Sequence, residues 1–132
     1  MKSYTDIEQS RKLDEILPVD SADSHYVRKN RDFRGEHVES EWSYPKYGNP
    51  NSKHANYIVQ NFSSYEKLPC WSLAALLGIL SFPALRYDIE DGEGGWIVSC
   101  EKNDKMYLSY YRDNPVDTCY EMILKLKENG LL

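Results

Sequence analysis

Residues 85–111, with the sequence LRYDIEDGEGGWIVSCEKNDKMYLSYY, decide the fold class of this chain. They contain three runs in which apolar and polar residues alternate: 85–90, 96–101 and 106–111. Such alternation is typical of strands that bury one face. The connections at 91–95 and 102–105 are polar or glycine-rich and short enough for hairpins. The stretch therefore predicts a three-stranded antiparallel meander.

Each of the three runs has one apolar face. These faces are formed by Leu85, Tyr87 and Ile89, by Trp96, Val98 and Cys100, and by Met106, Leu108 and Tyr110. After the third run, Asn114 can cap a helix, Pro115 suits its first position, and Gly130 stands at its end. The apolar residues of this last helix share one face, which we expect to cover the sheet.

The part of the chain before the meander contains two further helical patterns and a long irregular region. Residues 69–80 predict a buried helix, and residues 5–17 predict a helix that opens with Thr5 to Glu8 as a capping box. Residues 20–27 are compatible with a second short helix. Between 28 and 65 the periodicity is lost, and only 56–62 resembles a strand.

We therefore expect a single α+β domain over residues 1–132. Its order is an N-terminal helix, a long irregular insertion at 28–65, a buried helix, a three-stranded antiparallel meander and a C-terminal helix packed on the sheet. No internal repeat accompanies these elements.

Composition limits the classes of function. The 132 residues are 41% hydrophobic and 28% charged, with a net charge of −5, and this acidic balance disfavours binding to nucleic acid. The longest apolar stretch, 73–80, is far shorter than the ~20 residues of a bilayer-spanning helix. Because no apolar secretory segment lies near residue 1, we expect a cytoplasmic protein. In that compartment its three cysteines should be reduced thiols.

Cys70 is the sharpest chemical candidate in the sequence. At the start of the predicted helix 69–80, its thiol would have a lowered pKa, as a thiol-dependent hydrolase or transferase requires. A general base would also be needed, and His25, His37 and His54 belong to no catalytic signature. The alternative is that Cys70 is a small structural residue packed beside Trp71. We therefore assign no catalytic residue and no cofactor, and neither the zinc nor the calcium-loop spacing occurs, so we assign no metal ligand.

One basic cluster offers a nucleic-acid alternative. It consists of Arg28, Lys29, Arg31 and Arg34, with Tyr26 and Phe33 interleaved. Cationic and aromatic side chains together suit single-stranded nucleic acid. However, Glu36, Glu39 and Glu41 follow directly, and adjacent opposite charges favour a solvated, self-paired segment over a nucleic-acid contact.

Three aromatic residues inside the irregular region form the only other functional lead: Trp42, Tyr44 and Tyr47. Tryptophan and tyrosine dominate the binding hot spots of protein interfaces, because they bury a large area at a small entropic cost. The alternative is that these rings fold back onto the chain's own core, and the pattern does not distinguish the two.

Two motifs carry a resemblance to a known family: PCWSLAALL at 69–77 and DNPVDTCYEMI at 113–123. Together with the opening YTDIEQS at 4–10, they resemble small uncharacterised proteins of prophages and integrative mobile elements from gut-dwelling Gram-negative anaerobes. The likeness covers roughly residues 3–25 and 66–132. It implies a mobile-element origin and a cytoplasmic setting, and transfers no catalytic residue. We expect a non-enzymatic accessory protein that touches an unidentified protein partner through residues 28–65.

Overall fold

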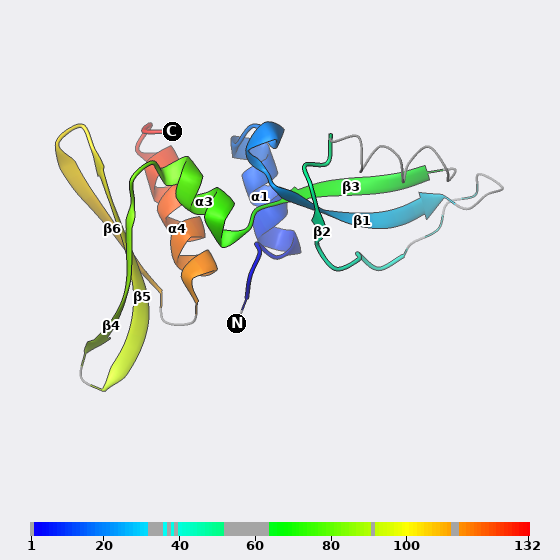
Figure 1. Ribbon diagram of the computed structural model, residues 1–132. Coiled ribbons are helices and arrows are strands. Elements are labelled where there is room, and N and C mark those ends of the chain that lie inside the picture. The colour runs from blue at the N-terminus through cyan, green and yellow to red at the C-terminus, as the bar shows by residue number, and fades with distance from the viewer. Residues whose placement is uncertain are drawn as a thin grey trace. The chain divides into compact units, whose positions relative to one another are not determined.

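The computed structural model describes residues 2–31, 36, 38, 40–51, 64–90, 92–111 and 114–132. Its internal contacts divide the chain into two compact units. One unit is Asp6–Trp71, and the other joins Met1–Thr5 to Ser72–Leu132. Figure 1 shows helices and antiparallel strands along the chain, so the expected α+β class is confirmed. The single domain stays a prediction.

The unit with the C-terminal residues contains the predicted meander. Strands β4 (Ala84–Glu90), β5 (Glu93–Lys102) and β6 (Lys105–Tyr111) form one antiparallel sheet in the order β4-β5-β6. Asn103 and Asp104 join β5 to β6 with φ angles of 53° and 62°. A two-residue hairpin turn needs positive φ at both positions, and asparagine and aspartate tolerate it better than other side chains. The turn sequence therefore sets the register of β6.

Helix α4 (Pro115–Glu128) packs on β5 and β6, as expected. Its inward residues Val116, Cys119, Met122, Ile123 and Leu126 are inaccessible to solvent. Val98 and Cys100 of β5 are buried as well. Helix α3 (Leu73–Leu80) lies beside α4 (Figure 1) and buries Leu76 and Leu80. These apolar side chains make up the core of the unit.

The apolar face of β6 is not on the covered side of the sheet. Ser109 lies opposite Val98, whereas Leu108 lies opposite Ser99, and directly opposed residues share a face. Ser109 is therefore the buried residue, while Met106, Leu108 and Tyr110 are 45–58% exposed. A one-residue change of register exchanges the two faces of a strand, so the tight turn before β6 decides which residues face α4.

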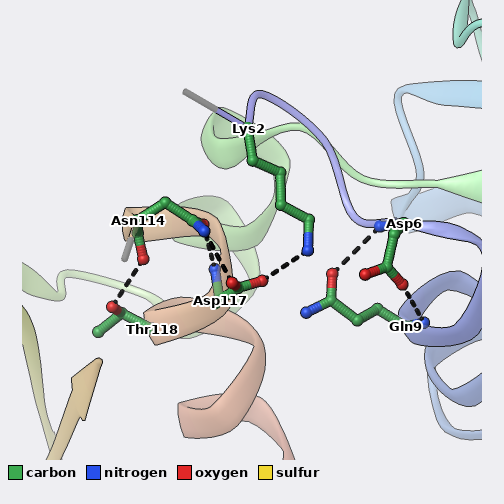
Figure 2. A network of polar contacts seen from close by, with 6 residues as sticks. All are labelled: Lys2, Asp6, Gln9, Asn114, Asp117 and Thr118. Carbon is green, nitrogen blue, oxygen red and sulfur yellow. Dashed lines mark hydrogen bonds and ion pairs between the residues drawn. The ribbon is translucent and has the colours of Figure 1, made fainter. Parts of the chain in front are cut away.

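The N-cap of α4 is built as predicted. The Asn114 side chain accepts a hydrogen bond from the Asp117 amide at 2.8 Å and donates to the Asp117 carboxylate at 2.7 Å. The Lys2 ammonium forms an ion pair with the same carboxylate at 2.7 Å, which ties the start of the chain to this helix (Figure 2). An acidic side chain in the first turn also complements the helix dipole.

We expect Asn114→Ala to destabilise the protein by ~1 kcal/mol, because the substitution removes the capping acceptor of α4. The matched control is Asn129→Ala at the exposed C-terminal end of the same helix, which should cost less. Urea unfolding followed by circular dichroism measures both. Equal losses for the two variants would contradict the role of the cap.

The unit Asp6–Trp71 contains α1 (Ile7–Ile16), a 3-10 turn η1 (Val19–Ser21) and a second sheet. Strands β1 (Ser24–Arg31), β2 (Lys46–Tyr47) and β3 (Ser64–Cys70) are antiparallel, in the order β2-β1-β3. Leu13 of α1, Leu68 of β3 and Trp71 are buried. The Trp71 indole donates to the Ser21 hydroxyl at 3.0 Å, which satisfies the polar atom of a fully buried ring.

The capping box of α1 is displaced by one residue from the predicted one. Asp6, not Thr5, is the N-cap, and its carboxylate accepts from the Gln9 amide at 2.8 Å. The Gln9 side chain accepts from the Asp6 amide at 3.1 Å (Figure 2). Both the predicted and the observed pairs have the spacing of a capping box, and local sequence does not separate them.

Three predictions for this region are wrong. Residues 20–27 do not form a helix, because residues 24–27 belong to β1. Residues 28–65 are not wholly irregular, since they include the end of β1, all of β2 and the start of β3.

The predicted helix 69–80 begins only at Leu73, where the Ser72 hydroxyl caps it, and Pro69 belongs to β3. Proline is tolerated there because β3 is an edge strand. The strand predicted at 56–62 lies outside the described residues.

No helix in the described part of the chain is long and apolar enough to cross a membrane.

Candidate protein-binding site around Trp42

The segment 40–43 runs along the outer edge of β1 and is fastened there by two serine hydroxyls. Ser43 donates its amide to the Val27 carbonyl at 2.9 Å, and its hydroxyl accepts from the Val27 amide at 3.1 Å. The Ser40 hydroxyl accepts from the Lys29 amide and donates to the Lys29 carbonyl, both at 2.8 Å. These contacts satisfy backbone amide and carbonyl groups of β1, and they fix the positions of Glu41, Trp42 and Tyr44.

The other end of the segment is anchored by β2 and by the turn that follows it. His25 is fully buried, and its Nδ1 lies 2.7 Å from the Gly48 carbonyl. Because a carbonyl only accepts, Nδ1 carries the proton. The Asn49 side chain donates to the carbonyls of Val19 and Ala22. Residues 40–49 are thus tied to β1 at one end and to both β1 and η1 at the other.

Trp42 stacks against an arginine of β1. The guanidinium carbon of Arg28 lies 4.5 Å from the centroid of the indole ring, within the range of a cation–π contact. Arg28 Nε also lies 2.6 Å from the Glu66 carboxylate on β3. Arg28 is therefore occupied by contacts within its own unit, and it orients Trp42.

A hollow of about 510 Å³ opens beside Trp42. Its lining consists of residues 41–45, which include Trp42 and Tyr44, together with Ile7 of α1 and Tyr26 of β1. The Tyr44 side chain is 89% exposed, whereas Tyr26 is buried. Five of the seven lining residues are aromatic or aliphatic, as in sites that bind an apolar side chain.

Tyr26 remains a neutral phenol at physiological pH. Burial, followed by the nearby Cys70 and Asp6, raises its pKa to about 12. Tyr26 therefore contributes an uncharged phenol to the lining, and the acidic group of the lining is the exposed Glu41 side chain.

The structure brings together two of the three aromatic residues singled out in the sequence. Trp42 and Tyr44 line the same hollow, while Tyr47 lies on β2, 89% exposed and outside that lining. Ile7 and Tyr26 complete the lining, and no pattern in the sequence singled them out for it. They come from α1 and β1, and only tertiary packing brings them next to the 42–45 segment.

Cys70 does not have the surroundings that its predicted position implied. It is the last residue of β3, not the start of a helix, and it is fully buried. Burial, and next the negative charge of Asp23, raise the pKa of its thiol to about 12. In the β1–β3 pairing Ser24 lies opposite Cys70 and His25 lies opposite Pro69, so the imidazole is on the other face of the sheet. His25 is the only histidine among the described residues.

The basic cluster is described only in part. Arg28 is held by Trp42 and Glu66, while Arg34 and Phe33 lie outside the described residues. Nucleic-acid binding by this cluster stays a prediction. Within the described ranges, no group of three histidine, cysteine, aspartate or glutamate residues could hold a metal ion.

Comparison with known proteins adds no relative. No protein-family model, no curated protein and no solved structure matches the chain.

Proposed function

We propose that this chain is a protein-interaction module that binds a partner protein through the hollow beside Trp42 and Tyr44. The observation that carries the proposal is Tyr44, which is 89% exposed on a segment that serine hydroxyls fasten to β1, directly beside an aromatic-walled hollow. A large ring on a backbone that hydrogen bonds already fix loses little conformational entropy on binding, and such residues form binding hot spots.

The lining defines the chemistry of the partner. An apolar side chain would contact Trp42, Tyr44 and Tyr26, and a basic group beside it would meet the Glu41 carboxylate of the lining. Tyr47 extends the exposed aromatic surface along β2. The resemblance of the sequence to mobile-element proteins supports an accessory role in the cytoplasm of the host.

The test is a selection of binding peptides from a displayed library, with the full chain as the immobilised target. Each peptide of the library contains a basic and an apolar residue. We expect Tyr44→Ala to weaken binding of the selected peptides about tenfold or more, as loss of a hot-spot ring does. Phe82→Ala is the matched control, since Phe82 is a fully exposed aromatic residue in the other unit.

Fluorescence titration or calorimetry measures the affinities, and circular dichroism verifies that each variant is folded. Peptides that bind wild type and Tyr44→Ala equally would overturn the proposal. The same holds if Phe82→Ala causes the larger loss.

A further inference from the structure

Strand β4 is an open edge of its sheet. In the order β4-β5-β6 both outer strands are edges. On β6 the Lys125 ammonium donates to the Leu108 carbonyl, which occupies a backbone acceptor of that edge. Among the described residues no strand pairs with the outer side of β4. Its register with β5 runs without a bulge from Ala84 to Glu90, and the strand contains no proline and no lysine. Of the devices by which proteins usually protect an edge, β4 has charged side chains, Arg86 and Asp88, but no bulge and no proline.

The side chains of β4 are exposed on both faces. Tyr87 and Ile89 are 55% and 68% exposed, and they lie on the face that carries Trp96. Arg86 and Asp88 point to the other face, and the atoms of their ion pair are 4.0 Å apart. A long ion pair between two exposed side chains contributes little, so both charges are accessible to another molecule.

The sequence of β4 is complementary to itself when it is reversed about Tyr87. Antiparallel pairing of two copies centred on Tyr87 places Arg86 opposite Asp88 of the second copy, and Leu85 opposite Ile89 of the second copy. By symmetry each of these pairs occurs twice, as in an isologous interface. Opposite charges and apolar pairs across adjacent strands are stabilising.

Other registers of the same edge are less favourable. Centring on Arg86 or on Asp88 places that residue opposite its own copy, and like charges directly across a strand pair are destabilising. A register displaced by one residue sets Arg86 opposite Tyr87, so that polar and apolar residues share a face. The Tyr87-centred register is thus selected by charge and by polarity together.

Tyr87 is already ordered in the isolated sheet. Its ring stands edge-on to Trp96 at 5.3 Å between centroids, and it lies over Gly94, where an added Cβ would clash with the phenol. An ordered ring at the centre of an interface reduces the entropic cost of association.

We infer that β4 pairs with β4 of a second copy of this chain, antiparallel and centred on Tyr87, so that the two sheets become continuous. This homodimer uses the unit that contains the meander, and it does not depend on the site around Trp42.

Charge reversal tests the register. Sedimentation equilibrium of the full chain should show a dimer that dissociates on dilution. Arg86→Asp or Asp88→Arg alone should weaken the dimer about tenfold or more, because like charges then face each other in both symmetry-related pairs. The doubly exchanged variant should dimerise like wild type. An equimolar mixture of the two single variants should form a heterodimer, because every reversed side chain then faces an opposite charge.

A cross-link gives a second readout that does not depend on charge. Opposed residues of antiparallel strands have Cα atoms about 4.5–5.5 Å apart, which suits a disulfide. Tyr87→Cys should therefore form covalent dimers under mild oxidation, whereas Ala84→Cys should not, since position 84 faces position 90. Cys70, Cys100 and Cys119 are buried and should not interfere.

A chain that stays monomeric up to ~1 mM would overturn the inference. So would a dimer that neither single charge reversal weakens, or cross-linking at position 84 as efficient as at position 87.

Discussion

Trp71→Ala is expected to destabilise the protein by ~3–5 kcal/mol, in the range measured when a large buried side chain is removed. Trp71 has no solvent exposure, and its indole donates to the Ser21 hydroxyl at 3.0 Å. The substitution leaves a cavity in the unit Asp6–Trp71 and removes a hydrogen bond in the same step. Trp71→Phe should cost less, because most of the ring volume remains.

Trp42→Ala is the matched comparison, since Trp42 belongs to the same unit but is only half-buried. Its ring stacks on the guanidinium of Arg28, and an exposed cation–π contact contributes about 0.5–1 kcal/mol. We therefore expect a loss well below that of Trp71→Ala. Urea unfolding monitored by circular dichroism compares the two. If Trp42→Ala costs as much as Trp71→Ala, residues 40–45 belong to the core and the binding proposal loses its basis.

The second large effect is a loss of stability at alkaline pH. Burial raises the pKa values of the Cys70 and Cys119 thiols to about 12 and that of the Tyr26 phenol to about 12. In the unfolded chain the thiols titrate near 9 and the phenol near 10. The folded state thus holds protons that the unfolded state releases, and its stability must fall as pH rises.

The contribution of each thiol is complete below about pH 9 and is lost as pH rises to about 12. Each group removes ~1.4 kcal/mol of unfolding free energy per pH unit within that window. Because whole domains are stable by only ~5–15 kcal/mol, we expect cooperative unfolding between pH 9 and 12. Melting temperatures across that range, for wild type and for Cys70→Ala, measure the effect.

Cys70→Ala should be less stable than wild type at pH 7 but should lose stability less steeply above pH 9. Leu13→Ala, a core change without a titratable group, is the control and should retain the wild-type slope. Alkylation gives an independent measurement, since a protonated buried thiol reacts only when the chain opens. Rapid alkylation of Cys70 at pH 7 would contradict the raised pKa and restore the hypothesis of a thiol-dependent enzyme.

The meander and α4 could be predicted because their signals are local. Alternating residues 85–90, 96–101 and 106–111 and the short turns between them specify strands that pair with their neighbours in the chain. The Asn114 cap and Pro115 likewise act within one helical turn. Elements of this kind need no distant partner to define their type.

The first sheet could not be predicted, because its pairing is distant in sequence. Ser24 of β1 pairs with Cys70 of β3, and this pairing converts residues 24–27 from a short helical pattern into a strand. It also places Pro69 and Cys70 in a strand, and so removes the helix-start position on which a reactive thiol depended. Local propensity is weak compared with the burial that such a pairing provides.

The candidate site divides in the same way. Residue type alone singled out Trp42, Tyr44 and Tyr47, since large amphipathic rings in a polar segment are typical of binding surfaces. The contribution of Ile7 and Tyr26 to the lining, and the stacking of Arg28, arise only when α1 and β1 meet the 42–45 segment. The amino-acid sequence thus specified local elements and the kinds of side chain available. Tertiary packing decided their partners and exposure, because both depend on contacts between residues far apart in the chain.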